Sequence, residues 1–453
     1  MSVTCPAYER CGACQGLRTP YPEQLARKRE AVAQVFRDAG LRIRVQEVCG
    51  MEDPYHYRNK VIAAVSMQGG RVVCGLYEEY SHRVVPMEGC LLQDKRLNAV
   101  LATLTRLLNE LKIRPFGYGG TLKHVLLRLA ARTGQVLLVL VSSEELMHGR
   151  KELLARLRAA CPEVATVVQN IQPRQTSVVL GPREKVLFGP GYIFDELLGR
   201  RYKISARSFY QVNPLQTERL YAKALSLAAL RPGDTLMDAY CGIGTIGLSA
   251  TSGAASQGQN GPICPSPAGI EGSQGQNGLI CPSQAGIKGS QGQNGPICPS
   301  QAGKDADVRI IGVEINRDAV QDAIANARAN GVRNARFYCA DVSAFMREFD
   351  APVDVLMLDP PRAGCDEEFL RAVLQMAPRR IVYVSCNPAT QARDVAFLLR
   401  ASAPARPRHN NAVRNPRPAR GPQYVLNPEA WPFDLFPHTS HVENIVCLEQ
   451  IKP

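Results

Sequence analysis

The sequence predicts an α/β fold in which a Rossmann-like domain with a mostly parallel sheet follows a central α/β domain and an N-terminal cysteine-cluster segment. Three observations in the C-terminal half support this. Short apolar runs alternate with helical patterns from Lys203 onward, a glycine-rich turn follows one run, and acidic residues end others. Such alternation is typical of parallel strands with helices on both faces. The expected strands are residues 235–239, 308–313, 354–358 and 380–384, with a helix over 318–329.

The part of the chain before this domain has mixed patterns. A helical run covers residues 97–111, and strand-like runs cover residues 136–141 and 164–168. With 453 residues, the chain is long enough for two or three domains. We therefore expect a cysteine-cluster segment over residues 1–95, a central α/β domain over 96–200 and the Rossmann-like domain over 201–453.

Two stretches of low complexity interrupt the C-terminal domain. A 17-residue repeat begins at Ser256, Ser273 and Ser290, and its polar, Gly-rich sequence shows neither a strand nor a helix period. Because it has too few apolar residues to offset the entropy of ordering, we expect residues 256–303 to form a disordered loop. Residues 401–422 are rich in Pro and Arg and contain no acidic residue, which predicts an extended basic linker.

The overall composition limits the class of protein. Lys and Arg outnumber Asp and Glu by 54 to 41, a formal net charge of +13. This excess suits a polyanion partner such as RNA, although a merely basic soluble protein would show it too. The 15 cysteines are odd in number and irregularly spread, which argues against a disulfide framework, and no apolar run approaches membrane-spanning length. We therefore expect a cytoplasmic monomer with no membrane and no protein partner.

The glycine turn after the first expected strand is a candidate cofactor site. Asp238 lies in that strand, and Gly242 and Gly244 allow the backbone to approach a ligand closely. In nucleotide-binding folds, a carboxylate about 20 residues beyond such a turn binds ribose hydroxyls. Glu314 is 70 residues beyond Gly244, but without the 48 residues of the repeats the spacing is 22. The glycines differ from the dinucleotide pattern, so the acid before them favours S-adenosylmethionine (SAM), and Asp341 is expected to face the adenine.

An acid and a thiol follow two other expected strands. Asp359 and Cys386 both stand at strand ends, where ligands bind in open α/β sheets. A thiolate that adds to carbon 6 of uracil turns carbon 5 into a nucleophile able to attack the SAM methyl group, and a base must then remove the carbon 5 proton. Glu443, which stands beside two histidines, is the candidate base. Alternatively, Cys386 is a buried filler and Glu443 a surface acid at a strand edge.

Five motifs with polar or reactive residues occur in the order 208–213 (SFYQVN), 238–245 (DAYCGIGT), 359–362 (DPPR), 385–388 (SCNP) and 441–443 (HVE). This set resembles the RNA uracil-5-methyltransferase family, most of all its 23S ribosomal RNA members, over nearly the whole chain outside the two low-complexity stretches. The resemblance implies a SAM-dependent enzyme that acts on RNA, with Cys386 as nucleophile and Glu443 as base. It also implies that SAM is bound by Gln211, Tyr240, Thr245, Glu314, Asp341 and Asp359.

Four N-terminal cysteines form a candidate metal site. Cys5, Cys11 and Cys14 have the spacing C-x5-C-x2-C, and Cys90 follows later. Four thiolates can hold a [4Fe–4S] cluster or a zinc ion, and the spacing alone does not separate the two. The family resemblance implies the [4Fe–4S] cluster, because many relatives carry one on this spacing.

Three other functions remain open. A transfer RNA uracil-5-methyltransferase would share the catalytic motifs, although that branch typically lacks the four cysteines. An amino-group methylase would share the acid-Pro-Pro sequence at Asp359, and it would stay active after replacement of Cys386 by Ala. A non-catalytic iron–sulfur protein that binds RNA would fail to bind SAM.

Deleting residues 256–303 should leave the affinity for SAM nearly unchanged, because the cost of closing a loop depends only weakly on its length. Isothermal titration calorimetry of the intact and the shortened proteins would test this expectation. A large loss of SAM affinity in the shortened protein would show that the repeats support the cofactor-binding domain.

Overall fold

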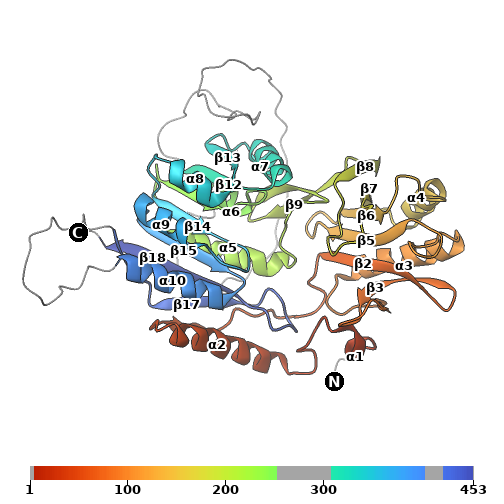
Figure 1. Cartoon of the computed structure of the whole chain (residues 1–453), viewed down its shortest axis with the longest axis horizontal. Helices are drawn as coiled ribbons and strands as arrows, with labels where there is room; N and C mark the ends of the chain where they lie inside the picture. The colour runs from red at the N-terminus through yellow and green to blue at the C-terminus, as the bar shows by residue number, and fades with distance from the viewer. Residues whose placement is uncertain (1–4, 252–307, 403–421, 452–453) are drawn as a thin grey trace, which may run out of the picture.

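The computed structural model describes residues 5–251, 308–402 and 422–451 of the chain (Figure 1). Among these residues the largest sheet has nine strands. Five neighbours, β13-β12-β11-β14-β15, run parallel, and β18 joins β15 in the antiparallel direction. Helices alternate with these strands along the chain, which confirms the predicted Rossmann-like α/β architecture. The six strands are β11 (Thr235–Ala239), β12 (Arg309–Glu314), β13 (Ala335–Cys339), β14 (Val355–Leu358), β15 (Arg380–Ser385) and β18 (Glu443–Ile451).

The antiparallel side of this sheet joins an N-terminal strand to the C-terminal strands. Strands β16 (Gln423–Leu426) and β17 (Glu429–Phe433) pair with β18, and β1 (Arg44–Val45) pairs in parallel with β17. Helix α2 (Tyr21–Asp38) lies along α10 (Pro388–Ser402), as the lower edge of Figure 1 shows. The N-terminal segment therefore packs against the Rossmann-like domain at the far end of the sequence.

A second sheet of seven described strands has the order β4-β3-β2-β5-β6-β7-β8, and helices α3 and α4 pack with one of its faces. Helix α3 corresponds to the predicted helix over 97–111, and β6 and β7 to the predicted strands over 136–141 and 164–168. The sheet draws strands from both sides of the boundary expected between residues 95 and 96. Its elements are β2 (Lys60–Gln68), β3 (Arg71–Tyr77), β4 (Val84–Pro86), α3 (Lys95–Glu110), β5 (Leu122–Leu129), β6 (Val136–Ser142), α4 (Arg150–Ala160), β7 (Val164–Ile171) and β8 (Arg183–Phe188).

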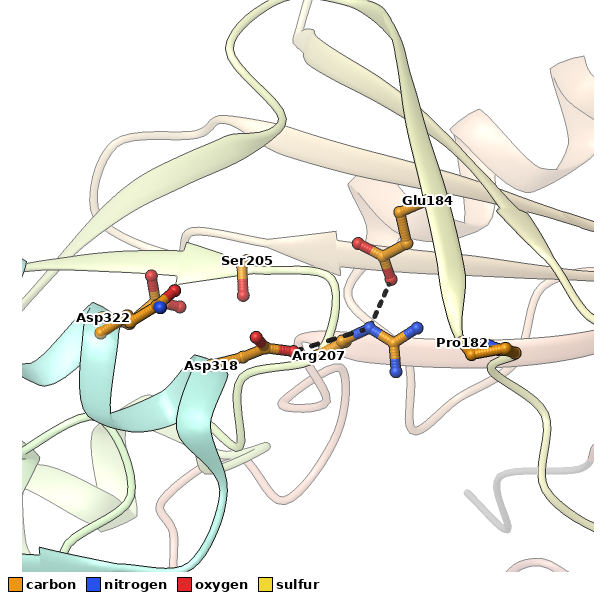
Figure 2. Close-up of a pocket in the computed structure, with 7 residues that line it drawn as sticks. Pro182, Glu184, Ser205, Arg207, Asp318 and Asp322 are labelled. Carbon is orange, nitrogen blue, oxygen red and sulfur yellow. Dashed lines mark ion pairs between the residues drawn. The ribbon is translucent and has the colours of Figure 1, made fainter. Parts of the chain in front are cut away.

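The two sheets meet at a polar junction around Arg207, which follows the hairpin of β9 (Tyr192–Leu197) and β10 (Arg200–Ser205). Figure 2 shows the Arg207 side chain between two carboxylates. Its Nε lies 3.0 Å from Glu184 Oε1 of β8 and 3.8 Å from Asp318 Oδ2 of α7 (Arg317–Ala329). These residues line a cavity of about 320 Å³, whose lining includes none of the predicted catalytic or cofactor-binding residues. Arg207 therefore links the central sheet to the Rossmann-like domain.

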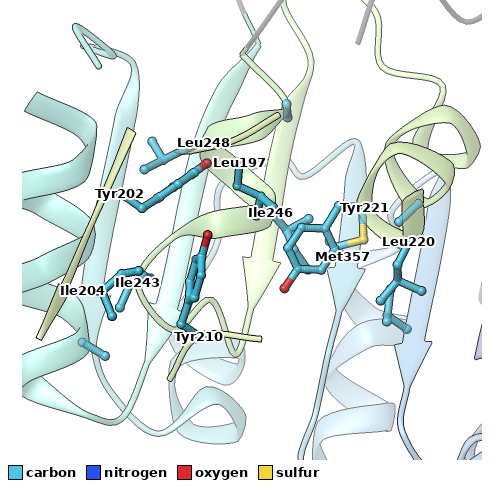
Figure 3. Close-up of a cluster of buried hydrophobic side chains, with 14 of the residues drawn as sticks. Leu197, Tyr202, Ile204, Tyr210, Leu220, Tyr221, Ile243, Ile246, Leu248 and Met357 are labelled. Carbon is cyan, nitrogen blue, oxygen red and sulfur yellow. The ribbon is translucent and has the colours of Figure 1, made fainter. Parts of the chain in front are cut away.

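Two apolar cores cover the opposite faces of the nine-stranded sheet. On one face, Met357 of β14 shares a cluster with Tyr221 and Ile246, and Figure 3 shows this group. On the other face, the neighbouring Leu356 shares a cluster with Phe36 of α2. Successive residues of a strand point to opposite faces, so strands covered on both sides are apolar throughout. The helices that contribute are α5 (Pro214–Ala228), α6 (Thr245–Ser249) and α7 on the first face, and α2, α8 (Val342–Glu348), α9 (Glu367–Met376) and α10 on the second.

Two predicted features lie wholly or mostly outside the described residues. These are the repeats over 256–303 and, except for residues 401, 402 and 422, the basic linker over 401–422. Both expectations stay predictions. In the described part of the chain, no helix is both long enough and apolar enough to cross a membrane.

Candidate active site

The topology of the sheet brings Asp359, Cys386 and Glu443 together. Asp359 directly follows β14 and Cys386 directly follows β15, so both lie at the carboxyl edge of the parallel strands. The antiparallel strand β18 pairs Asn444 with Ser385, which places Glu443 beside Cys386 at the same edge. The sequence interpretation expected the first two residues to meet, and the strand pairing adds the third.

Burial raises the pKa values of these three groups, and repulsion by neighbouring charges adds to this for Glu443 and Cys386. The pKa of Glu443 rises to about 8, because of burial first and the charge of Asp359 second, while Arg362 acts in the opposite direction. Burial raises the pKa of Asp359 to about 7. Burial also raises the pKa of the Cys386 thiol, and the charges of Glu443 and Asp359 raise it further. A carboxyl group that titrates near neutral pH is suited to act as a general base.

Arg362 supplies positive charge at this edge. Its charge and its hydrogen bond lower the pKa of Cys386, and its charge also lowers that of Glu443. Its carbonyl oxygen accepts a hydrogen bond from Asn387 Nδ2 at 3.0 Å, which ties the loop after β14 to the loop that carries Cys386. The sequence interpretation gave Arg362 no role. The available signal was its place directly after the acid-Pro-Pro sequence at a strand end.

The glycine turn after β11 folds around Glu314, the last residue of β12. Glu314 Oε2 accepts a hydrogen bond from the Gly242 N–H at 3.1 Å, and Oε1 accepts one from the Asn316 N–H at 2.8 Å. Gly242 and Gly244 have φ values of +55° and +81°, which glycine adopts without strain. The turn and the predicted ribose-binding carboxylate are therefore in direct contact, although the repeats separate them in the sequence.

Three carboxyl groups concentrate negative charge where β11, β12 and β14 end. Asp238 is 1% exposed, and its Oδ2 accepts a hydrogen bond from the Gly247 N–H at 2.8 Å. Its Oδ1 has no hydrogen-bond partner among the described residues. Burial raises the pKa of Asp238 to about 7; the Gly247 hydrogen bond opposes this, whereas Asp359 and Glu314 add to it. A ligand with positive charge would relieve this repulsion, and SAM carries such charge on its sulfonium and amino groups.

Tyr221 of α5 interacts with three predicted cofactor residues, Gln211, Thr245 and Asp359. Burial raises the pKa of Tyr221 and the charge of Asp359 raises it further, whereas side-chain hydrogen bonds with Thr245 and Gln211 lower it. Tyr221 is 2% exposed, and its ring is labelled in Figure 3. The sequence interpretation missed Tyr221, because an aromatic residue on the buried face of a helix gives the same pattern as ordinary core.

Tyr240 and Asp341 form a second group of predicted cofactor residues. Tyr240 has a φ of +68°, which is rare for an aromatic residue and is often found at functional sites. The centroid of its ring lies 5.9 Å from the centroid of the Phe369 ring. Burial raises the pKa of Tyr240, Cys365 adds to this, and Asp341 makes a smaller contribution. Asp341 is also the N-cap of α8, so it has a structural role beside the one predicted for it.

The four N-terminal cysteines converge without forming a complete metal site. Cys11 ends α1 (Tyr8–Cys11), Cys5 and Cys14 flank that helix, and Cys90 follows β4. All four thiols are free and partly buried. Burial and then the charges of Cys11, Cys5 and Cys90 raise the pKa of Cys14 to about 12. Nevertheless, no three His, Cys, Asp or Glu residues of the described part are arranged to hold a metal ion.

Comparison with known proteins gives a family for this geometry. Residues 304–403 match the model of a family described as tRNA (Uracil-5-)-methyltransferase. Uncharacterized RNA methyltransferases of Halalkalibacterium halodurans and Clostridium acetobutylicum are 34% and 32% identical to the chain, and each match covers 99% of this chain and 83% of the relative. The crystal structure of Pyrococcus abyssi tRNA (uracil-54, C5)-methyltransferase in complex with S-adenosyl-L-homocysteine shares the fold, with a TM-score of 0.67 and 21% identity over 99% of this chain and 88% of that one. The chain therefore belongs to the RNA uracil-5-methyltransferase family and is a SAM-dependent methyltransferase.

Proposed function

We propose that this protein methylates carbon 5 of a uridine in 23S ribosomal RNA through a covalent intermediate on Cys386. The observation that carries the proposal is the strand pairing that sets Cys386 beside Glu443, with Asp359 acting on both. Methylation of an amino group would need neither a thiol nucleophile nor a base for a carbon-bound proton. The RNA methyltransferase relatives support RNA as the substrate.

The proposed reaction has three steps. The Cys386 thiolate forms a bond to carbon 6 of the uracil. The electron pair of the carbon 5–carbon 6 double bond moves toward carbon 5, which becomes the nucleophilic carbon of an enolate. Carbon 5 then attacks the methyl carbon of SAM, whose bond to sulfur breaks to leave S-adenosylhomocysteine. Finally, the Glu443 carboxylate takes the carbon 5 proton, the double bond forms again, and the Cys386 thiolate leaves.

The six predicted cofactor residues would border the bound SAM. Glu314 would bind the ribose hydroxyls and Asp341 would face the adenine. A bound cation lowers the pKa of carboxyl groups around it. SAM would therefore offset the repulsion between Asp238, Glu314 and Asp359. The remaining residues proposed to contact SAM are Gln211, Tyr240 and Thr245.

Transfer RNA is the second candidate substrate. Both the matching family and the Pyrococcus abyssi protein are named for transfer RNA, which favours it. The four N-terminal cysteines favour the ribosomal RNA branch. Incubation with labelled SAM and either 23S ribosomal RNA or transfer RNA, followed by mapping of 5-methyluridine, would decide between them. Methylation of transfer RNA alone would contradict the ribosomal assignment.

We also propose that Cys5, Cys11, Cys14 and Cys90 hold a [4Fe–4S] cluster. Four thiols in one region are the right kind of donor set, although their arrangement in the described residues does not enclose a metal ion. A bound cluster would join the N-terminal segment to the loop after β4, so its contribution would be structural.

Protein purified without oxygen should be brown and contain iron and sulfide. Cys90→Ser should remove the colour, because it removes one of the four proposed ligands. The matched control is Cys74→Ala, which changes a buried thiol of the central sheet and should keep the colour. Iron analysis and the visible absorption spectrum would measure both. Stoichiometric zinc without iron would contradict the cluster.

The enzyme should form a denaturation-resistant adduct with RNA that contains 5-fluorouridine, because fluorine does not leave carbon 5 as a proton does. Cys386→Ala should form none, whereas Glu443→Gln should accumulate adduct even on unmodified RNA. As a control, Cys447→Ala changes a fully buried thiol of β18 and should still form the adduct. Denaturing gels would show each species, and an active wild-type enzyme without adduct would exclude the covalent mechanism.

Release of the methylated RNA should accelerate with pH up to about 8 and then level off. The base acts as a carboxylate, and a pKa of about 8 leaves most Glu443 protonated at pH 7. Each pH unit below 8 should therefore slow release about tenfold. Rapid-quench measurements on adduct formed beforehand would separate this step from ionisation of Cys386. A release rate that stays constant between pH 6 and 8 would refute the assigned pKa.

A further inference from the structure

The hairpin loop between β17 and β18, residues 434–442, is joined to α2 by a buried ion pair. Lys28 Nζ lies 2.7 Å from Asp434 Oδ1, and the two side chains are 5% and 0% exposed. Lys28 also donates to the Phe436 carbonyl at 3.1 Å, and Tyr21 Oη donates to Asp434 Oδ2 at 3.0 Å. Two residues of α2 therefore hold the first turn of the loop.

A second set of contacts holds the middle of the loop at His438. Gln24 Oε1 accepts a hydrogen bond from the His438 N–H at 3.0 Å, and Gln24 Nε2 lies 3.1 Å from His438 Nδ1. The His438 carbonyl accepts a hydrogen bond from the Gly16 N–H at 2.9 Å. His438 has a φ of +67°, an uncommon conformation for a residue other than glycine. The N-terminal segment thus forms hydrogen bonds with both the backbone N–H and the carbonyl of a strained residue, which stabilises its conformation.

The loop leads directly to the proposed base. Only eight residues separate Asp434 from Glu443, and β17 and β18 pair Phe433 with Glu443 at the base of the hairpin. Within the loop, Thr439 Oγ1 donates to the Phe436 carbonyl at 2.8 Å and accepts from the His441 N–H at 3.2 Å. His441 Nε2 in turn lies 3.3 Å from the guanidinium of Arg362. A continuous set of contacts therefore runs from α2 to the neighbours of Glu443.

A buried ion pair is a poor source of stability, because removing two charges from water costs about as much as their attraction returns. Burial lowers the pKa of Lys28 even though Asp434 acts to raise it. The exposed pair of Arg27 and Glu23 on the same helix carries no such desolvation cost. The buried pair instead restricts the position of the loop, since few other positions of the loop would satisfy both charges.

We propose that α2 positions the catalytic-base hairpin, and that Lys28 and Asp434 are positioning residues for removal of the carbon 5 proton. The proposal rests on the proposed role of Glu443. Cys386, Asp359 and the cofactor residues stand on other strands or loops, and the hairpin reaches Cys386 indirectly, through the contact of His441 with Arg362. Methyl transfer should therefore depend on this support less than proton removal does. Loss of the pair should therefore separate the two chemical steps.

The test compares Lys28→Met/Asp434→Asn, which removes both charges at once, with Glu23→Gln/Arg27→Gln, which removes the exposed pair of the same helix. Single-turnover reactions with labelled SAM and unmodified RNA would measure methyl transfer and release of methylated RNA separately. In the first variant, methyl transfer should stay within about twofold and release should slow by about 10- to 100-fold, as for a displaced catalytic group. Adduct should accumulate, and the control should behave as wild type.

The ratio of adduct to free product does not depend on the amount of folded enzyme, so a simple loss of fold would not raise it. A parallel fall of both steps would contradict the positioning role. Tyr21→Phe, which removes only the 3.0 Å contact to Asp434, should shift the ratio less but in the same direction. An unchanged ratio in both variants would overturn the proposal.

Amide hydrogen exchange of residues 435–442 gives a readout independent of the chemistry. Exchange should become faster in Lys28→Met/Asp434→Asn, while that of β14 and β15 stays unchanged. Unchanged protection of the loop would refute the support by α2. If Glu443→Gln accumulated no adduct while the loop still lost protection, the assignment of the base would be wrong and the support by α2 would stand.

Discussion

The charge of Asp359 acts on both halves of the candidate active site. It raises the pKa of Asp238 and Tyr221 on the cofactor side, and of Cys386 and Glu443 on the reaction side. Asp359 has this reach because β14 lies between β11 and β15 in the sheet. A positively charged methyl donor beside it would weaken the repulsion on both sides. Binding of SAM and ionisation of the proposed thiol nucleophile and base would thus be coupled through one carboxyl group.

The meeting of Cys386 and Glu443 depends on the direction and the register of β18. This strand runs antiparallel to β15, so its first residue lies where the parallel strands end. A slip of one residue would turn Glu443 to the opposite face of the sheet. The loop before β18 must therefore deliver the strand in a single register, and its contacts with α2 restrict where it can lie.

The parallel strands could be predicted because each is covered on both faces and is apolar throughout. The shared location of Asp359 and Cys386 could also be predicted, since the carboxyl ends of parallel strands lie at one edge of the sheet. The support of the hairpin could not, because Lys28 and Asp434 are 406 residues apart and neither belongs to a motif. Tyr221 has the pattern of a core residue, so nothing local distinguishes it. The seven-stranded sheet crosses residue 95 because pairing between β2 and β5 joins strands on both sides of α3, and local patterns do not show such pairing.

The pairing of the two ends of the chain has a consequence for synthesis on the ribosome. Helix α2 and β1 are made long before their partners α10 and β17. At about 5 to 20 residues per second, the 406 residues between Lys28 and Asp434 take roughly 20 to 80 seconds to translate. During that time the apolar face of α2, with Val32 and Phe36, lacks its packing against α10. A nascent chain therefore carries an amphipathic helix that lacks its α10 partner until synthesis is nearly complete, and a chain that ends before α10 never packs the helix in this way.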